Sequence, residues 1–299
     1  MEKHIINGEV FAFTDKVRDN PAVRSSFNDL TRLIYNFDFE PWQTAGYWDD
    51  NYRPYALLHN GKVVSVASAN TIKFRFDGRP RRYVQIGTVM THPAYRGRGL
   101  SRRLLERILT DWRARCDCMY LYANDRVLDF YPKFGFIGVH EYKYSCPAPA
   151  PGRNVRARKL DMGCEADREF LLRAYARSNP YSRLAMENNA GLVMFCCLSE
   201  MRDNVWYIDA YETAVIAAFI SDTLLCDDIF GKGEVPLQAI LAALVSEGVR
   251  RVVFGFTPID QTGCRANLLK AKDATFFILR DKENLFANHK LMLPLLSHA

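Results

Sequence analysis

The sequence has few of the features that mark a membrane-bound, secreted or metal-binding protein. Its apolar runs are short and interrupted, so none is long enough to cross a bilayer. Its N-terminus, which includes Glu2, Lys3 and His4, contains no apolar signal core. Its eight cysteines form no C-x-x-C motif and no paired Cys/His spacing. We therefore expect a reduced, cytoplasmic protein with no metal and no membrane partner.

The length and composition indicate a folded protein with two domains. The chain has 299 residues, of which 48% are hydrophobic and 25% charged, and this balance is typical of globular proteins. Pro147, Pro149 and Pro151, followed by Gly152, mark a linker. We therefore expect one domain over residues 1–146, a proline-rich linker over 147–154, and a second domain over 155–299.

The positive charge is concentrated in one block of the chain. Residues 51–115 contain 14 Lys and Arg but three Asp and Glu, whereas residues 1–50 contain five basic and nine acidic residues. A polyanionic ligand would be drawn to residues 51–115 and a cationic ligand to residues 1–50. Nucleic acid is a weaker interpretation of the basic block, because its arginines flank one short loop and no nucleic-acid-binding motif is present.

That short loop has the pattern of an anion-binding site. A β-rich segment ends at Thr91, Pro93 interrupts it, and the sequence Arg96-Gly97-Arg98-Gly99 leads directly into an amphipathic helix over residues 100–112. The backbone N–H groups of such a turn converge, the helix dipole adds partial positive charge, and the glycines allow close approach. The pattern therefore predicts a phosphate site. A surface turn with solvated arginines is the alternative.

The spacing excludes the two commonest phosphate-binding motifs. The dinucleotide motif G-x-G-x-x-G fails because Arg102 stands at its third glycine, and the Walker lysine is absent. The remaining pattern, Arg-x-x-Gly-x-Ser from Arg96 to Ser101, resembles the pyrophosphate loop Gln/Arg-x-x-Gly-x-Gly/Ala of the GNAT acyltransferases. Ser101 departs from the family pattern at its last position, but it is small enough to preserve the backbone geometry.

A second segment is similar to another signature of the same family. After the apolar run 119–122, the chain continues through Asn124 to Phe130-Tyr131 and closes with Gly135-Phe136. Asn124 or Asp125 can cap a short helix there, and Gly135 can end it. A helix aromatic that merely packs is the alternative for Tyr131. The order and spacing of the two motifs identify residues 50–145 as a member of the GNAT family.

This resemblance implies acetyl-CoA as the donor and assigns roles to particular residues. Tyr131 matches the general acid that protonates the leaving thiolate, and Asn124 matches a position that often contacts the cofactor arm. The backbone groups of the fourth strand of the family would pair with the pantetheine arm, and the turn would hold the pyrophosphate. The matching residues are Val89, Met90 and Thr91 for the arm, and Arg96, Gly97, Arg98, Gly99, Leu100 and Ser101 for the pyrophosphate.

The acceptor implied by the resemblance is an amine, of a small molecule or a peptide. Residues 37–52 interleave aromatics with carboxylates, which favours a cationic acceptor bound by charge pairing and cation–π contact; the relevant side chains are Asp38, Glu40, Trp42, Trp48 and Asp49. An aromatic-packed pair of helices with solvated acids is an equal alternative. The general base stays open among Asp38, Glu40, Asp49 and Asp50.

The last residues, 293–299, are apolar enough to be buried. They are similar in this respect to the multidomain aminoglycoside acetyltransferases, in which a C-terminal carboxylate lies in the acceptor site. Whether the chain forms a homodimer is left open.

The second half repeats the order of elements found in the first. Strands over 205–208, 211–220 and 223–229 precede Gly231-Lys232-Gly233-Glu234, a helix, and a strand over 252–256. We expect a mixed α/β fold with a second, degenerate GNAT-like domain, in which Glu234 would oppose a bound pyrophosphate. An unrelated α/β domain is the structural alternative. For the whole chain, a binding module that senses acyl-CoA without turnover is the functional alternative.

Overall fold

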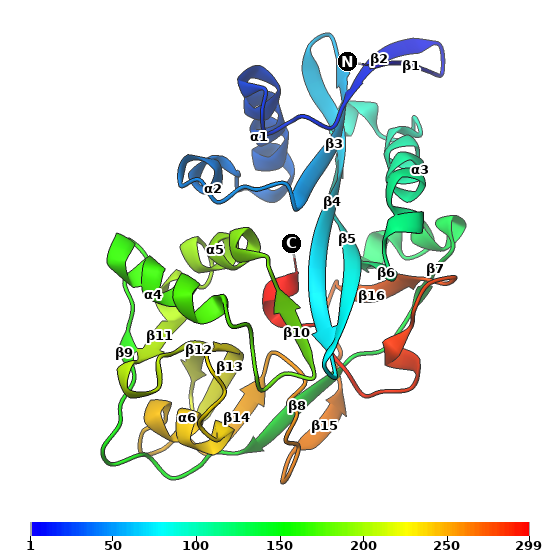
Figure 1. Cartoon of the computed structure of the whole chain (residues 1–299). Helices are drawn as coiled ribbons and strands as arrows, with labels where there is room; N and C mark the ends of the chain where they lie inside the picture. The colour runs from blue at the N-terminus through cyan, green and yellow to red at the C-terminus, as the bar shows by residue number, and fades with distance from the viewer. Residues whose placement is uncertain (1, 299) are drawn as a thin grey trace.

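The N-terminal half of the chain forms a sheet because apolar, β-rich segments alternate with tight turns. Asn60 and Gly61 adopt left-handed backbone angles between two strands, and Asp77 and Gly78 do the same between the next two. Both pairs therefore form the hairpin turns that such sequences favour. The computed structural model, which describes residues 2–298, places this sheet beside a second one (Figure 1).

The first sheet is mixed, and one of its strands comes from the far end of the chain. In spatial order its strands are β1 (Glu2–Ile6), β2 (Glu9–Thr14), β3 (Tyr52–His59), β4 (Lys62–Phe76), β5 (Arg79–Thr91), β6 (Cys118–Ala123), β16 (Thr275–Leu279) and β7 (Phe136–Gly138), and β10 (Leu184–Glu187) pairs with β4. Strands β5 and β6 run parallel, whereas the other pairs are antiparallel.

Helices cover both faces of this sheet. α3 (Leu100–Trp112) packs its apolar stripe against one face, and α1 (Pro21–Tyr35) and α2 (Glu40–Thr44) cover part of the other (Figure 1). α1 begins directly after Asn20, whose side chain caps it by accepting a hydrogen bond from the Val23 N–H at 3.2 Å. None of the helices between residues 2 and 298 is both long enough and apolar enough to span a bilayer.

The second sheet repeats the central arrangement of the first. Its strands, in spatial order, are β15 (Arg265–Leu268), β8 (Tyr142–Pro147), β14 (Arg251–Phe254), β13 (Thr223–Phe230), β12 (Thr213–Ile220), β11 (Val205–Ile208) and β9 (Arg158–Lys159). The parallel pair β13 and β14 is joined by α6 (Leu237–Leu244), as β5 and β6 are joined by α3. Two further helices, α4 (Glu165–Tyr175) and α5 (Ala190–Leu198), lie between the sheets (Figure 1). The predicted mixed α/β class with a second GNAT-like unit is confirmed.

The two sheets exchange strands. β8 follows β7 in the chain, yet it pairs with β14 in the second sheet. β16 follows β15, yet it pairs with β6 and β7 in the first sheet. The sheets therefore do not divide at the expected boundary of residues 147–154, because hydrogen-bonded ladders cross it in both directions. The segment from 148 to 157 contains no helix or strand and lies against the end of α6, where the Gly152 N–H donates to the Ala242 carbonyl at 2.7 Å.

One hydrophobic core joins the two halves. Ile72 and Tyr120 of the first sheet pack in the same cluster as Leu171 of α4 and Val205 of β11, and all four side chains are buried. The tail of the chain enters this cluster through Leu293, which is fully buried. Burial of this much shared apolar surface fixes the two sheets relative to each other.

Candidate functional site

The parallel strands β5 and β6 separate and leave a cavity between them. They pair from Tyr83 to Gln85 on β5, and β5 then continues to Thr91 without β6 beside it. A cavity of about 220 Å³ lies in this opening. The side chains that matter most for its chemistry are Tyr35, Gln85, Thr88, Tyr122, Asn124, Tyr131 and His298. An opening at the carboxyl ends of parallel strands is the usual ligand position in α/β sheets.

The backbone of β5 is irregular where it borders this cavity. The register against β4 shifts between Val66 and Ser68, which is a β-bulge, and Thr88 has a positive φ of 48°. A β-branched residue in this conformation is strained by roughly 1–3 kcal/mol, and such strain is concentrated at functional sites. The Thr88 hydroxyl lies 2.5 Å from the Tyr52 hydroxyl, and the Val89 carbonyl accepts a hydrogen bond from Tyr35 at 3.0 Å. The bulged residues Thr88 and Val89 both line the cavity.

The predicted anion loop lies directly after β5. Gly97 and Gly99 have φ values of 74° and 82°, which L-residues with a side chain rarely adopt. A Cβ atom on either would meet nothing within 4 Å, so the space above the turn is open. α3 then begins at Leu100 without a side-chain cap, and the Ser101 hydroxyl lies 2.8 Å from that of Thr91. The turn therefore presents an uncovered helix N-terminus.

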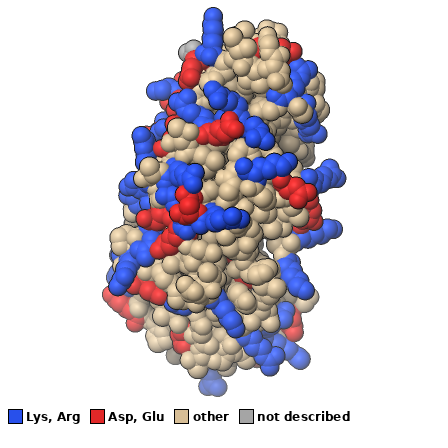
Figure 2. Space-filling model, turned by 90° about the vertical axis from the view of Figure 1, so that its right-hand side faces the viewer, with Lys and Arg blue, Asp and Glu red and all other residues tan. Residues whose placement is uncertain are grey.

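The two arginines of the loop differ in their surroundings. The Arg96 guanidinium is exposed and donates to the Thr91 carbonyl at 3.2 Å. Arg98 forms an ion pair with Glu9 at 2.9 Å and lies 5.0 Å from the centre of the Tyr95 ring. The face that carries α3 has many Lys and Arg side chains with Asp and Glu among them (Figure 2). An anion at the loop would therefore meet Arg96 with fewer competing carboxylates than Arg98.

Tyr131 and Asn124 both border the cavity. Tyr131 begins a short 3-10 helix, is 5% exposed, and packs against Phe277 of β16 with ring centres 6.3 Å apart. Burial raises the pKa of Tyr131, so its hydroxyl keeps its proton at neutral pH. The Asn124 amide donates to Asp273 at 3.0 Å. The second half of the chain thus supports both predicted residues.

The aromatic and acidic segment is placed elsewhere. The indoles of Trp42 and Trp48 stack at 5.5 Å and are at most 5% exposed. Three carboxylates of the segment are paired with arginines, and the fourth accepts from the Asn51 amide; these pairs are Asp38–Arg32, Glu40–Arg24, Asp50–Arg18 and Asp49–Asn51. This packing matches the alternative of an aromatic-packed pair of helices. None of the predicted acceptor residues lines the cavity at Tyr131.

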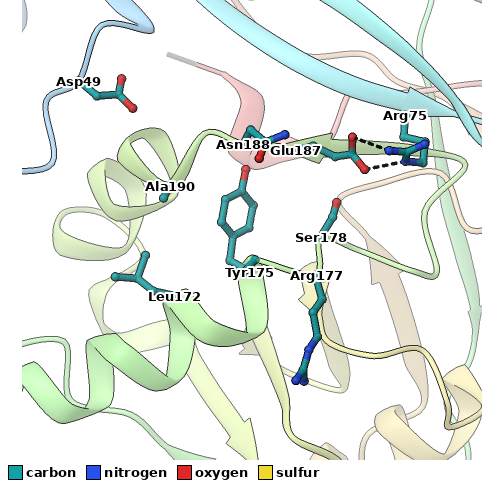
Figure 3. Close-up of a pocket in the computed structure, with 10 residues that line it drawn as sticks. Asp49, Arg75, Leu172, Tyr175, Arg177, Ser178, Glu187, Asn188 and Ala190 are labelled. Carbon is teal, nitrogen blue, oxygen red and sulfur yellow. Dashed lines mark hydrogen bonds and ion pairs between the residues drawn. The ribbon is translucent and has the colours of Figure 1, made fainter.

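Asp49 instead lines a larger cavity between the two halves. This space, of about 570 Å³, also receives Tyr175, Glu187 and Arg75 (Figure 3). Glu187 forms an ion pair with Arg75 at 2.6 Å, and the Tyr175 hydroxyl accepts from the Asn189 N–H at 2.9 Å. None of residues 2–298 lines both cavities. Within residues 2–298, no group of three or more His, Cys, Asp or Glu residues is arranged to hold a metal ion.

The tail of the chain contributes a cavity residue that neither sequence motif indicated. His298 lines the cavity, and its ring lies 4.1 Å from the ring of Tyr122. Burial lowers the pKa of His298 to about 4, so the imidazole is neutral at pH 7. The expected C-terminal carboxylate belongs to residue 299, which lies outside the described residues. No signal near either motif points to His298, because the fold alone brings the tail to β6.

The comparisons with known proteins agree with this geometry. Residues 24–136 match the Acetyltransferase (GNAT) family. A GCN5-related N-acetyltransferase from Kribbella flavida is similar over 91% of this chain and 72% of its own, with 18% identity and a TM-score of 0.58. Eis1 from Mycobacterium abscessus is similar over 91% and 73%, with 18% identity and a TM-score of 0.56. No curated protein matches by sequence.

The family match and the fold define the class of the protein. Residues 24–136 form a GNAT acetyltransferase domain, and the whole chain has the fold of the two-domain GNAT structures it resembles. The family resemblance that the two motifs carry is therefore confirmed. The family that residues 24–136 match is a family of acetyltransferases.

Proposed function

We propose that this protein is an N-acetyltransferase that moves the acetyl group of acetyl-CoA to a primary amine in a ternary complex. The observation that carries the proposal is the order of three features along β5. Tyr131 and the bulged backbone of β5 line one cavity, and the open glycine turn that begins α3 follows the end of β5. This order matches the order of pyrophosphate, pantetheine arm and thioester in the donor.

The donor would bind from the turn inward. The N–H groups of residues 97–101 would hold the pyrophosphate, with Arg96 and Arg98 nearby. The pantetheine arm would pair with the backbone of Val89, Met90 and Thr91, which has no β6 strand beside it. Asn124 would contact the arm from the opposite wall of the cavity.

The chemistry then requires two groups beside the thioester. A preorganised backbone N–H of β5 would stabilise the oxyanion of the tetrahedral intermediate. Tyr131, which is protonated at neutral pH, would give its proton to the departing thiolate. The strained bulge at Thr88 would fix the direction of the N–H groups that this step uses.

We infer that one molecule of CoA binds to each chain. In the second sheet the tail lies where β13 and β14 separate, because the Leu295 N–H donates to the Gly255 carbonyl at 2.8 Å. The Met292 N–H likewise donates to the Thr257 hydroxyl at 2.9 Å. The second gap is therefore filled by the chain itself, and Glu234 would add repulsion near α6. Calorimetry should give one equivalent of CoA per chain, and two equivalents would contradict the inference.

Amine-dependent release of the CoA thiol tests the proposed activity. Acetyl-CoA would be mixed with the protein and with amines of several classes, which include a monoamine, an amino sugar, a polyamine and a peptide. The proposal predicts thiol release that requires both protein and amine. A protein that binds CoA but releases thiol with none of these amines would support the acyl-CoA sensor instead.

A further inference from the structure

One row of side chains crosses the first sheet on the face opposite α3. Asn70 of β4 is in register with Gln85 of β5, and Gln85 is in register with Tyr120 of β6. Their sequence neighbours Ala69, Ile86 and Leu121 pack in the cluster under α3, so the row itself faces the second half of the chain. Tyr131 packs in the cluster under α3. Residues from both faces of the sheet therefore border the cavity: Tyr131 on the face of α3 and Gln85 on the opposite face.

The tail of the chain lies across this row. The Tyr120 hydroxyl donates to the Ser297 carbonyl at 2.9 Å, which holds the backbone just before His298. The His298 ring lies tilted against the ring of Tyr122, which is on the same face of β6 as Tyr120. The Nε2 atom of His298 is buried and has no hydrogen-bond partner within the described part of the chain. His298, a neutral imidazole with an unpartnered Nε2 atom, is thus one of the residues that line the cavity.

Asn70 is a second polar group on this face without a partner. Its side chain is 1% exposed, and neither its Oδ1 nor its Nδ2 atom has a hydrogen-bond partner among residues 2–298. A buried unsatisfied amide costs roughly 1–3 kcal/mol, so proteins rarely keep one without a use. Asn70 is paired with Gln85, which lines the cavity, across one strand spacing of about 5 Å. The Nε2 atom of His298 and the Asn70 amide therefore lie on the face of the sheet opposite Tyr131.

We propose that the acceptor amine enters from this face, that the Asn70 amide positions it, and that Nε2 of His298 takes the proton which the nitrogen loses during the attack. This inference rests on the proposed function.

The entering ammonium gives one proton to water. The neutral nitrogen then forms the C–N bond, its N–H proton passes to His298, the C–S bond breaks, and Tyr131 protonates the thiolate. Solvent returns the proton from His298 to Tyr131, so the cycle balances.

The lining of the cavity also indicates the class of acceptor. Its described lining residues are aromatic, amide, hydroxyl or apolar groups together with His298, and they include no Asp, Glu, Lys or Arg. A weak base suffices because the nitrogen of the tetrahedral adduct is more acidic than a free ammonium. An amine on an uncharged body that can form hydrogen bonds fits this lining better than a polycation. We therefore expect monoamines such as tyramine or glucosamine to react faster than spermidine.

Replacement and chemical rescue of the imidazole test the catalytic part. His298→Ala should lower kcat for the best amine by about a hundredfold and leave KM for acetyl-CoA nearly unchanged. Added free imidazole should restore part of the rate, whereas a packing role predicts no rescue. His298→Phe keeps a ring on Tyr122 and serves as the control for packing; it should be as slow as His298→Ala. Wild-type turnover in His298→Phe, or a lack of rescue, would overturn the assignment.

Asn70→Leu tests the positioning part by two independent measurements. Because the Asn70 amide is unsatisfied, an apolar side chain of the same size should raise the melting temperature. The same change should lower amine-dependent kcat/KM by at least tenfold and leave CoA affinity unchanged. The matched control is Asn28→Leu, because Asn28 is equally buried but donates to Glu40 at 3.0 Å and should lose stability. A lower melting temperature with full activity in Asn70→Leu would overturn the inference. Absence of amine-dependent turnover in the wild type would instead refute the proposed function.

Discussion

At the scale of single residues, Tyr131 offers the sharpest test of the donor chemistry. Tyr131→Phe keeps the ring that packs against Phe277 and removes the hydroxyl alone. General acid catalysis contributes typically ~10²–10⁴-fold, so kcat should fall by about that factor while CoA affinity stays the same. Steady-state kinetics would measure the loss, with Tyr211→Phe in the second half as the control. Turnover of Tyr131→Phe at the wild-type rate would show that the Tyr131 hydroxyl has no catalytic role and that the residue only packs.

Glu141 should make the stability of the protein depend on pH. It is 4% exposed, its carboxylate accepts from the Leu293 N–H at 2.8 Å and from Tyr122 at 3.1 Å, and Lys143 contributes a nearby positive charge. Burial raises the pKa of Glu141 from 4.5 to about 7. The folded state therefore binds more protons than the unfolded state between these values, and stability falls as pH rises through this window, by about 3 kcal/mol in all.

Glu141→Gln should remove this dependence. The variant cannot ionise, so its stability relative to the wild type should grow between pH 5 and pH 8. Urea denaturation at the two pH values would measure the difference, with Glu247→Gln on the surface as the control. An equal gap at both pH values would show that the Glu141 carboxyl titrates normally in the folded state.

At the scale of elements, we expect the start of α3 to decide whether the donor binds. Gly99→Glu should abolish CoA binding, because it places bulk and negative charge over the open turn. The control is Gly78→Glu, since Gly78 has the same φ of 82° and equally open surroundings but lies in the hairpin between β4 and β5. Both variants therefore carry the same backbone strain. Calorimetry should show lost CoA affinity in Gly99→Glu alone. Unchanged CoA affinity in that variant would show that the donor does not bind at this turn.

Elements set by local sequence could be predicted, and those set by distant partners could not. The strand to Thr91, the glycine turn and the helix from Leu100 follow from a contiguous pattern, and all are present. The carboxylates of residues 37–52 looked available for a cation because their arginine partners lie in other segments, as Glu40 and Arg24 show. His298 was missed as a residue with a role of its own for the same reason, since its contact with Tyr122 spans most of the chain.

At the scale of the whole molecule, the exchange of β8 and β16 makes the two halves interdependent. A fragment of residues 1–150 would lack β16 and would expose the edges of β6 and β7. We expect this fragment to aggregate and to bind no CoA. As the matched control, the full chain cut at a protease site inserted near Gly152 should stay associated on size exclusion and keep its CoA affinity. A soluble, CoA-binding fragment 1–150 would show that the first half folds alone.

This exchange also marks the limit of what sequence patterns reveal about the topology. The repeat of strand, helix and parallel strand was visible twice, so the existence of two similar units could be predicted. The linker prolines suggested a division near Pro147. Nothing in the short apolar run of β16 distinguishes a strand of one sheet from a strand of the other, because strand pairing is decided by the shared core.

Transfer of a labelled acetyl group tests the proposed function most directly. The full chain would be incubated with the amine panel and with acetyl-CoA that carries a trideuterated acetyl group. The products would be identified by mass spectrometry. We predict an amine that gains one labelled acetyl group, and its formation should fall sharply in Tyr131→Phe. Labelled acetate as the sole product, or acetyl-CoA recovered intact from its complex with the protein, would contradict an N-acetyltransferase.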